Sequence, residues 1–128
     1  MRLLIDTHAF LWYLLDDARL GATPKSLISD PDTDVEVSPA TLWEIAIKVS
    51  LNKYSLPEPL GEFLEREIAA NQFRILAIAP RHVAPLASLP FYHRDPFDRL
   101  IIAQAIVEDI PVVSRDTSFD DYPVRRLW

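Results

Sequence analysis

The chain has 128 residues, a length that fits one compact domain spanning residues 1–128. Hydrophobic residues make up 49% of the chain and charged residues 25%, which is typical of a globular protein and argues against disorder. No cysteine is present, and this excludes disulfide scaffolds, zinc–thiolate sites and thiol nucleophiles. The formal net charge of −6 argues against a basic surface for nucleic acid.

Only two glycines, Gly21 and Gly61, occur in the chain. They are too few and too far apart for a Walker loop, a dinucleotide-binding fingerprint or a nucleophile elbow. Asp6 and His8 interrupt the apolar residues of the amino terminus, so we expect no signal peptide. No apolar run approaches the roughly 20 residues that span a bilayer. The expected location is therefore cytoplasmic, without membrane contact.

Short apolar runs alternate with helical patterns along the whole chain. In chain order, we expect a strand at residues 2–5, helices at 8–15 and 24–28, a strand at 34–37, helices at 40–51 and 60–71, a strand at 74–78, helices at 82–89 and 95–108, and strands at 112–114 and 124–128. Thr23 is the expected N-cap of the second helix, and Asp95 that of the helix before the last two strands.

This alternation predicts the α/β class, with helices on both faces of a mostly parallel sheet of four or five strands. The strand at 124–128 is expected at an edge of the sheet. In such sheets the ligand site lies beyond the carboxyl ends of the strands, near a switch in strand order.

Acidic residues follow two of the predicted strands. Asp6 comes directly after the first strand and Asp116 just after the strand at 112–114, so their carboxylates are expected to converge. Taken alone, Asp6 is equally well explained as a helix N-cap, and Asp116 as an ordinary turn residue.

Two further acids lie on predicted helices. Asp98 extends the apolar stripe of its helix towards the helix start, so its carboxylate is either shielded at the rim or directed at a partner. Capping is sufficient to explain the neighbouring Asp95. Periodicity alone places Glu44 in an exposed ion pair with Lys48, four residues later, and only its position near the end of the second strand makes it a site candidate.

Gathered carboxylates need compensation. Two of them about 4 Å apart repel by roughly 4 kcal/mol at an effective dielectric near 20, so four together must take up protons or bind cations. Oxygen ligands favour Mg²⁺ or Mn²⁺, which activate water and stabilise charge in phosphoryl transfer. Cation binding would also offset most of the net negative charge. Arg94, Arg99 and Arg115 flank the acids and are candidates for contacting phosphates.

Four segments resemble the PIN-domain family, and most closely the VapC-type toxins of toxin–antitoxin pairs. They are LIDTH at 4–8, SPATLWEI at 38–45, HRDPFDRL at 93–100 followed by AQA at 103–105, and VSRD at 113–116. The resemblance covers essentially the whole chain and implies a Rossmann-like α/β/α sandwich, that is, a single PIN domain.

The same resemblance implies a Mg²⁺-dependent endoribonuclease, with Mn²⁺ as an alternative ion, that hydrolyses RNA phosphodiester bonds to 5′-phosphate and 3′-hydroxyl ends. It gives catalytic and metal-binding roles to Asp6, Glu44, Asp98 and Asp116. Thr7, Ser38 and Ser114 are expected to orient ligands or water, and supporting or substrate-positioning roles are expected for Asp95, Arg99 and Arg115.

The implied partners are an RNA substrate, a cognate antitoxin that covers the site, and a second copy of the chain in a homodimer. Apolar faces around Trp12, Tyr13, Trp43 and Ile47 are candidate contact surfaces, although core packing is favoured for each.

Two other acid-bearing α/β classes do not fit. A response-regulator receiver needs an acidic pair after the first strand, and a haloacid-dehalogenase-type phosphatase needs a second Asp two residues after Asp6. Thr7 and His8 occupy these positions. A catalytically silent PIN-fold binding protein and a metal-dependent DNA nuclease remain open.

Overall fold

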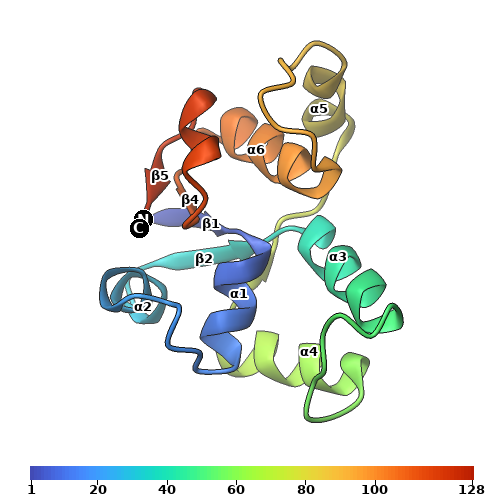
Figure 1. Cartoon of the computed structure of the whole chain (residues 1–128). Helices are drawn as coiled ribbons and strands as arrows, with labels where there is room; N and C mark the ends of the chain where they lie inside the picture. Colours follow the sequence, from blue (N-terminus) through green and yellow to red (C-terminus); the bar gives the residue numbers. More distant parts are fainter.

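The structure, a computed structural model, describes all 128 residues and contains one five-stranded sheet (Figure 1). Its order is β3-β2-β1-β4-β5, and every neighbouring pair is parallel. The strands are β1 (Arg2–Ile5), β2 (Asp34–Val37), β3 (Arg74–Ile75), β4 (Val112–Val113) and β5 (Arg126–Leu127). The predicted parallel sheet, with its last strand at an edge, is confirmed.

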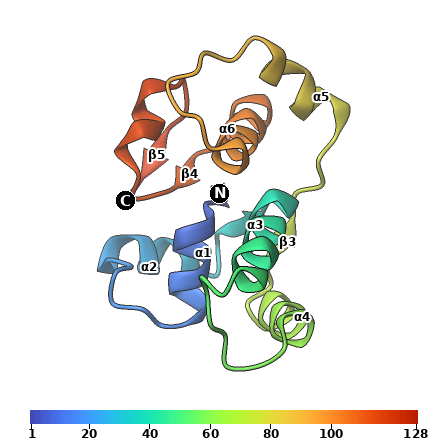
Figure 2. The ribbon, with the colours of Figure 1, turned by 45° about the vertical axis from the view of Figure 1, so that its right-hand side comes forward.

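Helices cover both faces of this sheet, as Figures 1 and 2 show. They are α1 (Thr7–Leu14), α2 (Ala22–Ser29), α3 (Pro39–Ser50), α4 (Leu60–Ala70), α5 (Pro80–Val83) and α6 (Pro96–Glu108), with short 3₁₀ helices η1 (Ala84–Ala87) and η2 (Thr117–Asp121). None of the helices combines the length and hydrophobicity needed to cross a membrane.

The alternation of side chains along β1 divides the core in two. Leu3 and Ile5 pack in the cluster formed with α1 and α2, whereas Leu4 packs with Ile101 and Ile102 of α6 on the opposite face. Helix α3 contributes to both clusters and contacts both α1 and α6. It therefore lies at the end of the sheet, between the two helical layers.

Several elements differ from the sequence prediction, and strand β5 covers only Arg126–Leu127 of the expected 124–128. Strand β3 ends at Ile75 because its partner β2 ends at Val37, where the next residue caps α3. The helix expected at 82–89 is divided into α5 and η1. Helix α2 begins at Ala22 after Gly21, without a side-chain cap, so the expectation that Thr23 caps it is wrong. Helix η2 was not expected.

The four apolar residues named as candidate contact surfaces differ in burial. Trp12 is buried in the core, as expected, and Tyr13 and Ile47 are half-buried. Trp43 is 63% exposed, which corrects the expectation of core packing for this residue. Its ring meets the ring of Phe97 edge-on, with centroids 5.2 Å apart, at the junction of α3 and α6.

The strand order places a switch point between β1 and β4. From β1 the chain adds β2 and β3 on one side, then crosses to add β4 and β5 on the other. The connections leaving the carboxyl ends of β1 and β4 diverge at such a point and leave a crevice. Asp6 and Asp116 follow these two strands.

Candidate metal centre

Asp6 lies between β1 and α1 and is almost completely buried. One carboxylate oxygen caps α1 by accepting a 2.9 Å hydrogen bond from the amide of Ala9, so the predicted capping role is confirmed. Burial raises the pKa of Asp6, although hydrogen bonds from the Ser114 hydroxyl and the Ala9 amide oppose this rise. The carboxylate is therefore held in place before any ligand binds.

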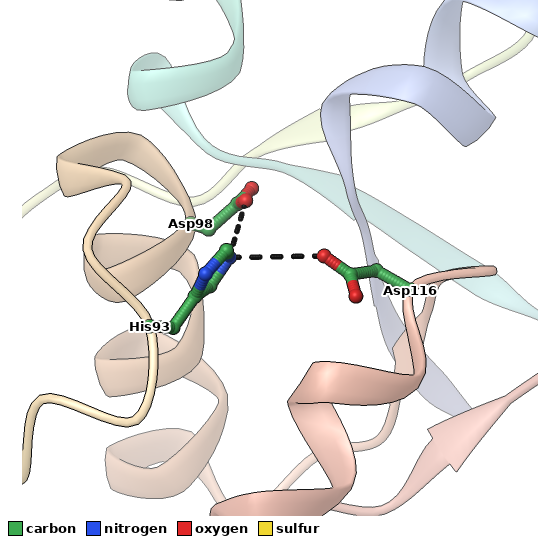
Figure 3. A group of neighbouring side chains, drawn as sticks. All are labelled: His93, Asp98 and Asp116. Atoms are coloured by element: carbon green, nitrogen blue, oxygen red, sulfur yellow. Dashed lines mark hydrogen bonds and ion pairs between the residues drawn. The ribbon is translucent and has the colours of Figure 1, made fainter.

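Asp98 lies in the first turn of α6, directed away from the helix towards His93 (Figure 3). The predicted N-cap, Asp95, accepts hydrogen bonds from the amides of Phe97 and Asp98 and so fixes this turn. Burial, together with the charge of Asp95, raises the pKa of Asp98 to about 7, against the opposing effect of His93. The ionised carboxylate thus lacks full compensation within the fold.

Asp116 caps η2, and its carboxylate accepts hydrogen bonds from the amide and hydroxyl of Ser118. Its own amide donates a 3.0 Å hydrogen bond to the Ser114 hydroxyl oxygen. Burial alone would raise the pKa of Asp116, but the two Ser118 hydrogen bonds and the nearby histidines lower it below its usual value. Ser114 therefore links Asp116 to Asp6.

His93, Asp98 and Asp116 form one group of potential ligands (Figure 3). The His93 Nε2 atom lies 2.7 Å from Asp98 Oδ2 and 3.7 Å from Asp116 Oδ2. One ligand atom from each of the three residues falls within 4.8 Å of the others. An open cleft of about 340 Å³ shares Asp116 with this group and is lined by Asp6, His8, Trp12, Arg115 and Asp116.

Glu44 is buried on α3, so the expectation that it forms an exposed pair is wrong. The pair itself exists, because Lys48 Nζ donates to Glu44 Oε2 at 2.8 Å. The other oxygen, Oε1, is buried without a hydrogen-bond partner. Glu44 is not part of the group formed by His93, Asp98 and Asp116.

These residues fit a divalent cation. The pKa values of Asp6 and Asp98 are raised, which shows that no positively charged group fully compensates these carboxylates. The buried Oε1 atom of Glu44 also has no hydrogen-bond partner. Oxygen ligands with one imidazole suit hard or borderline divalent ions.

The chain was compared with known protein families and structures. The family model of the PIN domain matches residues 3–124. The chain belongs to the PIN-domain family.

Three solved structures have the same fold as this PIN domain. VapBC2 from Rickettsia felis, bound to a DNA fragment from its promoter, gives a TM-score of 0.75 at 15% identity and covers 99% of this chain and 98% of its own. FitAcB from Neisseria gonorrhoeae gives 0.71 at 28% identity, covering 98% and 96%. FitAB bound to an IR36 DNA fragment gives 0.71 at 26%, covering 98% and 93%. No curated protein sequence matches the chain.

The small hydroxyl residues of this PIN domain hold the backbone around the acids. Ser38 caps α3 by accepting from the Ala40 amide at 3.1 Å. The Thr7 hydroxyl contacts the Thr41 hydroxyl at 3.1 Å and so joins the start of α1 to α3. Both interactions orient the helix starts that carry the acids.

The three arginines proposed to contact phosphates differ in their accessibility. Arg94 and Arg115 are exposed, and Arg115 lies over the Trp12 ring at 5.2 Å, on the wall of the cleft. Arg99 is buried and donates to the backbone carbonyls of Leu89 and Pro90. Its guanidinium holds the loop before α6, which fits the expected supporting role, and direct contact with phosphates stays a prediction.

His93 is the residue of this group that sequence reasoning did not select. It lies in a loop, where no periodicity indicates which way a side chain points. The only signal available was its position two residues before the N-cap Asp95 of a helix carrying a candidate acid.

Proposed function

We propose that this PIN domain is a divalent-metal-dependent endoribonuclease that acts as the toxin of a toxin–antitoxin pair. PIN domains are typically nucleases. The observation that carries the proposal is the grouping of Asp98 and Asp116 with His93 at the switch point of the sheet, near the buried Asp6, whose charge acts on Asp98. Asp6 and Asp116 also cap α1 and η2, but capping does not compensate the charge of Asp98, and a bound cation would.

Asp98 and Asp116 would hold the ion. Asp6, and Glu44 through its unpartnered oxygen, lie outside the group formed with His93 and would join the site from the neighbouring elements. A bound divalent ion supplies activation of water and neutralisation of phosphate charge. Ser114 keeps Asp6 and Asp116 in register, while Arg94 and Arg115 would bind the phosphates on either side of the scissile bond. Water attack at phosphorus with departure of the 3′ oxygen leaves 5′-phosphate and 3′-hydroxyl ends.

We further propose that a cognate antitoxin covers the site and that the toxin is a homodimer. The similar structures are those of VapBC2, FitAcB and FitAB, and two of the three were solved with a bound DNA fragment. An apolar groove between α3 and α4, lined in part by Leu42, Leu64 and Ile68, and the exposed ring of Trp43 offer surfaces for such partners.

The test is cleavage of labelled single-stranded RNA and of DNA of the same sequence by purified, antitoxin-free protein with Mg²⁺, Mn²⁺ or EDTA. We expect RNA cleavage that EDTA abolishes and that Asp6→Asn and Asp98→Asn each reduce at least about a hundredfold. Asp16→Asn is the matched control, because Asp16 is an exposed acid paired with Lys25 away from the site.

Each alternative has its own outcome in this assay. Preferential cutting of DNA would replace the ribonuclease with a DNA nuclease. Metal binding without cutting of either substrate would support the binding-only PIN protein. Cutting that survives both substitutions would contradict the proposed centre.

A further inference from the structure

The ring of His93 faces the carboxylates of Asp98 and Asp116 rather than solvent (Figure 3). Its side chain is only 19% exposed. On the other side the ring packs against Phe119 of η2, with the centroids 6.0 Å apart. The Nε2 atom is thus directed between two acids of the proposed centre.

The loop that carries His93 is anchored by hydrogen bonds from Arg99 and Tyr122. Arg99 of α6 donates to the carbonyls of Pro90 at 2.8 Å and Leu89 at 2.9 Å, and its guanidinium lies over the Phe91 ring at 4.0 Å. The Tyr122 hydroxyl donates to the same Pro90 carbonyl at 3.0 Å. Side chains held by a rigid supporting shell make the best-defined ligands.

His93 Nε2 is hydrogen-bonded to Asp98 in the metal-free protein, and its distances to the two carboxylates are close to those between ligands of one ion. In an octahedral site, adjacent ligand atoms lie about 3 Å apart and opposite ones about 4 Å apart. His93 Nε2 lies 2.7 Å from Asp98 Oδ2 and 3.7 Å from Asp116 Oδ2, so small shifts would bring all three atoms onto one ion.

We propose that His93 Nε2 is a metal ligand, so that the centre selects a first-row transition-metal ion such as Mn²⁺ over Mg²⁺. This inference rests on the proposed metal-dependent function and adds a nitrogen ligand to its acids. Imidazole binds transition-metal ions readily, whereas Mg²⁺ strongly prefers oxygen ligands and retains its water.

A histidine that only neutralises the acids gives the opposite expectation. Such a side chain competes with the cation and must leave before the ion binds. Replacing it would then strengthen the binding of every divalent ion, whereas replacing a nitrogen ligand weakens binding of transition-metal ions selectively.

The experiment uses the metal-stripped full chain with Mn²⁺ alone as the probe. Pulsed EPR reports nitrogen coupled to bound Mn²⁺, and titration gives the Mn²⁺ affinity, with Mg²⁺ measured by competition. We expect one imidazole coupling in the wild type that His93→Gln abolishes. His8→Gln is the control, because His8 lines the same cleft, and it should retain the coupling.

We expect His93→Gln to weaken Mn²⁺ binding about tenfold or more and to change Mg²⁺ binding less than about threefold. His93→Asn provides a second variant if the first does not fold, and thermal unfolding of the apo proteins monitors folding.

Mn²⁺ bound to the wild type without nitrogen coupling overturns the role of His93 and leaves the proposed function standing. Coupling that persists in His93→Gln, or equal or tighter Mn²⁺ binding by that variant, also overturns it. No Mn²⁺ binding by the wild type contradicts both the ligand and the metal-dependent function.

Discussion

The carboxylate of Glu44 is buried, with one oxygen bonded to Lys48 and the other without a partner. A buried charge that loses its only counter-charge costs far more than the ion pair contributes, because the desolvation is no longer offset. Burial lowers the pKa of Lys48, but its hydrogen bonds to Glu44 and Tyr54 and the charge of Glu44 together raise it above its usual value.

Lys48→Met should therefore destabilise the metal-free protein by about 3–5 kcal/mol. Methionine keeps the apolar stem, so the loss reports the charge. The double variant Glu44→Gln/Lys48→Met should recover most of this stability, as measured by urea denaturation. Equal destabilisation in the single and double variants would show that packing, and not the uncompensated carboxylate, carries the effect.

The sequence predicted the positions of Asp6 and Asp116 but not the surroundings of Glu44, Arg99 and His93. Asp6 and Asp116 follow strands, and a parallel sheet brings such positions together whatever the details of packing. Glu44 is buried because α3 packs between two helical layers. Neighbouring elements therefore cover more of α3 than its apolar stripe. Arg99 and His93 acquired their surroundings from a loop folding back on α6, which no local pattern encodes.

At the scale of the elements, an ionic cluster ties the carboxyl end of α6 to β1 and α5. Glu108 accepts hydrogen bonds from Arg2 at 3.1 Å and from Arg81, and His82 Nε2 lies 3.0 Å away. The fully buried His82 accepts the Ala79 amide at Nδ1, which leaves Nε2 to donate to Glu108. Hydrogen bonds from Arg81 and His82 lower the pKa of Glu108 to about 2.

A carboxyl group with a lowered folded-state pKa stabilises the protein above its unfolded pKa, about 4.5 here, and loses this effect as pH falls towards about 2. Glu108→Gln should therefore cost about 1–2 kcal/mol at pH 7. The difference from wild type should shrink steadily below pH 4.5 in denaturation measurements. A difference that does not change with pH would show that Glu108 contributes through packing alone.

Several helices are followed by a residue in the left-handed backbone conformation. Four non-glycine residues, Asp16, Asn52, Gln72 and Asp109, have φ between 50° and 57° just after helices. Asn and Asp tolerate this left-handed conformation better than Gln. Gln72 is exposed, and its backbone amide, which glycine keeps, donates a hydrogen bond to the Ala69 carbonyl.

Gln72→Gly should therefore stabilise the protein by about 0.5–1 kcal/mol, the relief of strain less the entropy of glycine. Gln72→Ala should bring no gain, because alanine keeps the Cβ atom, which is what makes a positive φ unfavourable. Denaturant midpoints at equal m-value give the comparison, and a midpoint that falls in the glycine variant would contradict the account.

The elements show the same division between what patterns encode and what tertiary structure decides. Strand and helix order followed from hydrophobic periodicity, and Asp6 and Asp95 acted as the expected caps. The length of β3 depends on where its neighbour β2 ends. Helix η2 depends on Asp116 acting as its N-cap in the folded chain. Such boundaries are set by partners that are distant in sequence.

For the whole molecule, the net charge of −6 governs how an RNA could approach. Exposed Lys and Arg side chains increase the affinity for phosphates, and Arg115 is the one Lys or Arg that lines the cleft. A divalent cation held by the acids would convert this negatively charged site into one that binds phosphate.

A short single-stranded RNA should accordingly bind at least about tenfold more tightly in Ca²⁺ than in EDTA, with Ca²⁺ as a poor catalytic ion. Fluorescence anisotropy measures this directly. The effect should vanish in Asp98→Asn and persist in Asp16→Asn. Equal RNA affinity with and without the cation would mean that the acids do not mediate substrate binding.

The most direct test of the whole account is anomalous diffraction from crystals of the protein soaked in Mn²⁺. We expect an anomalous peak in contact with Asp6, Asp98 and Asp116, at the carboxyl ends of β1 and β4, with Asp98→Asn removing or weakening it. Crystals without a peak among these carboxylates, or with Mn²⁺ bound only elsewhere, would contradict the central claim that this PIN domain gathers its acids to hold a divalent metal.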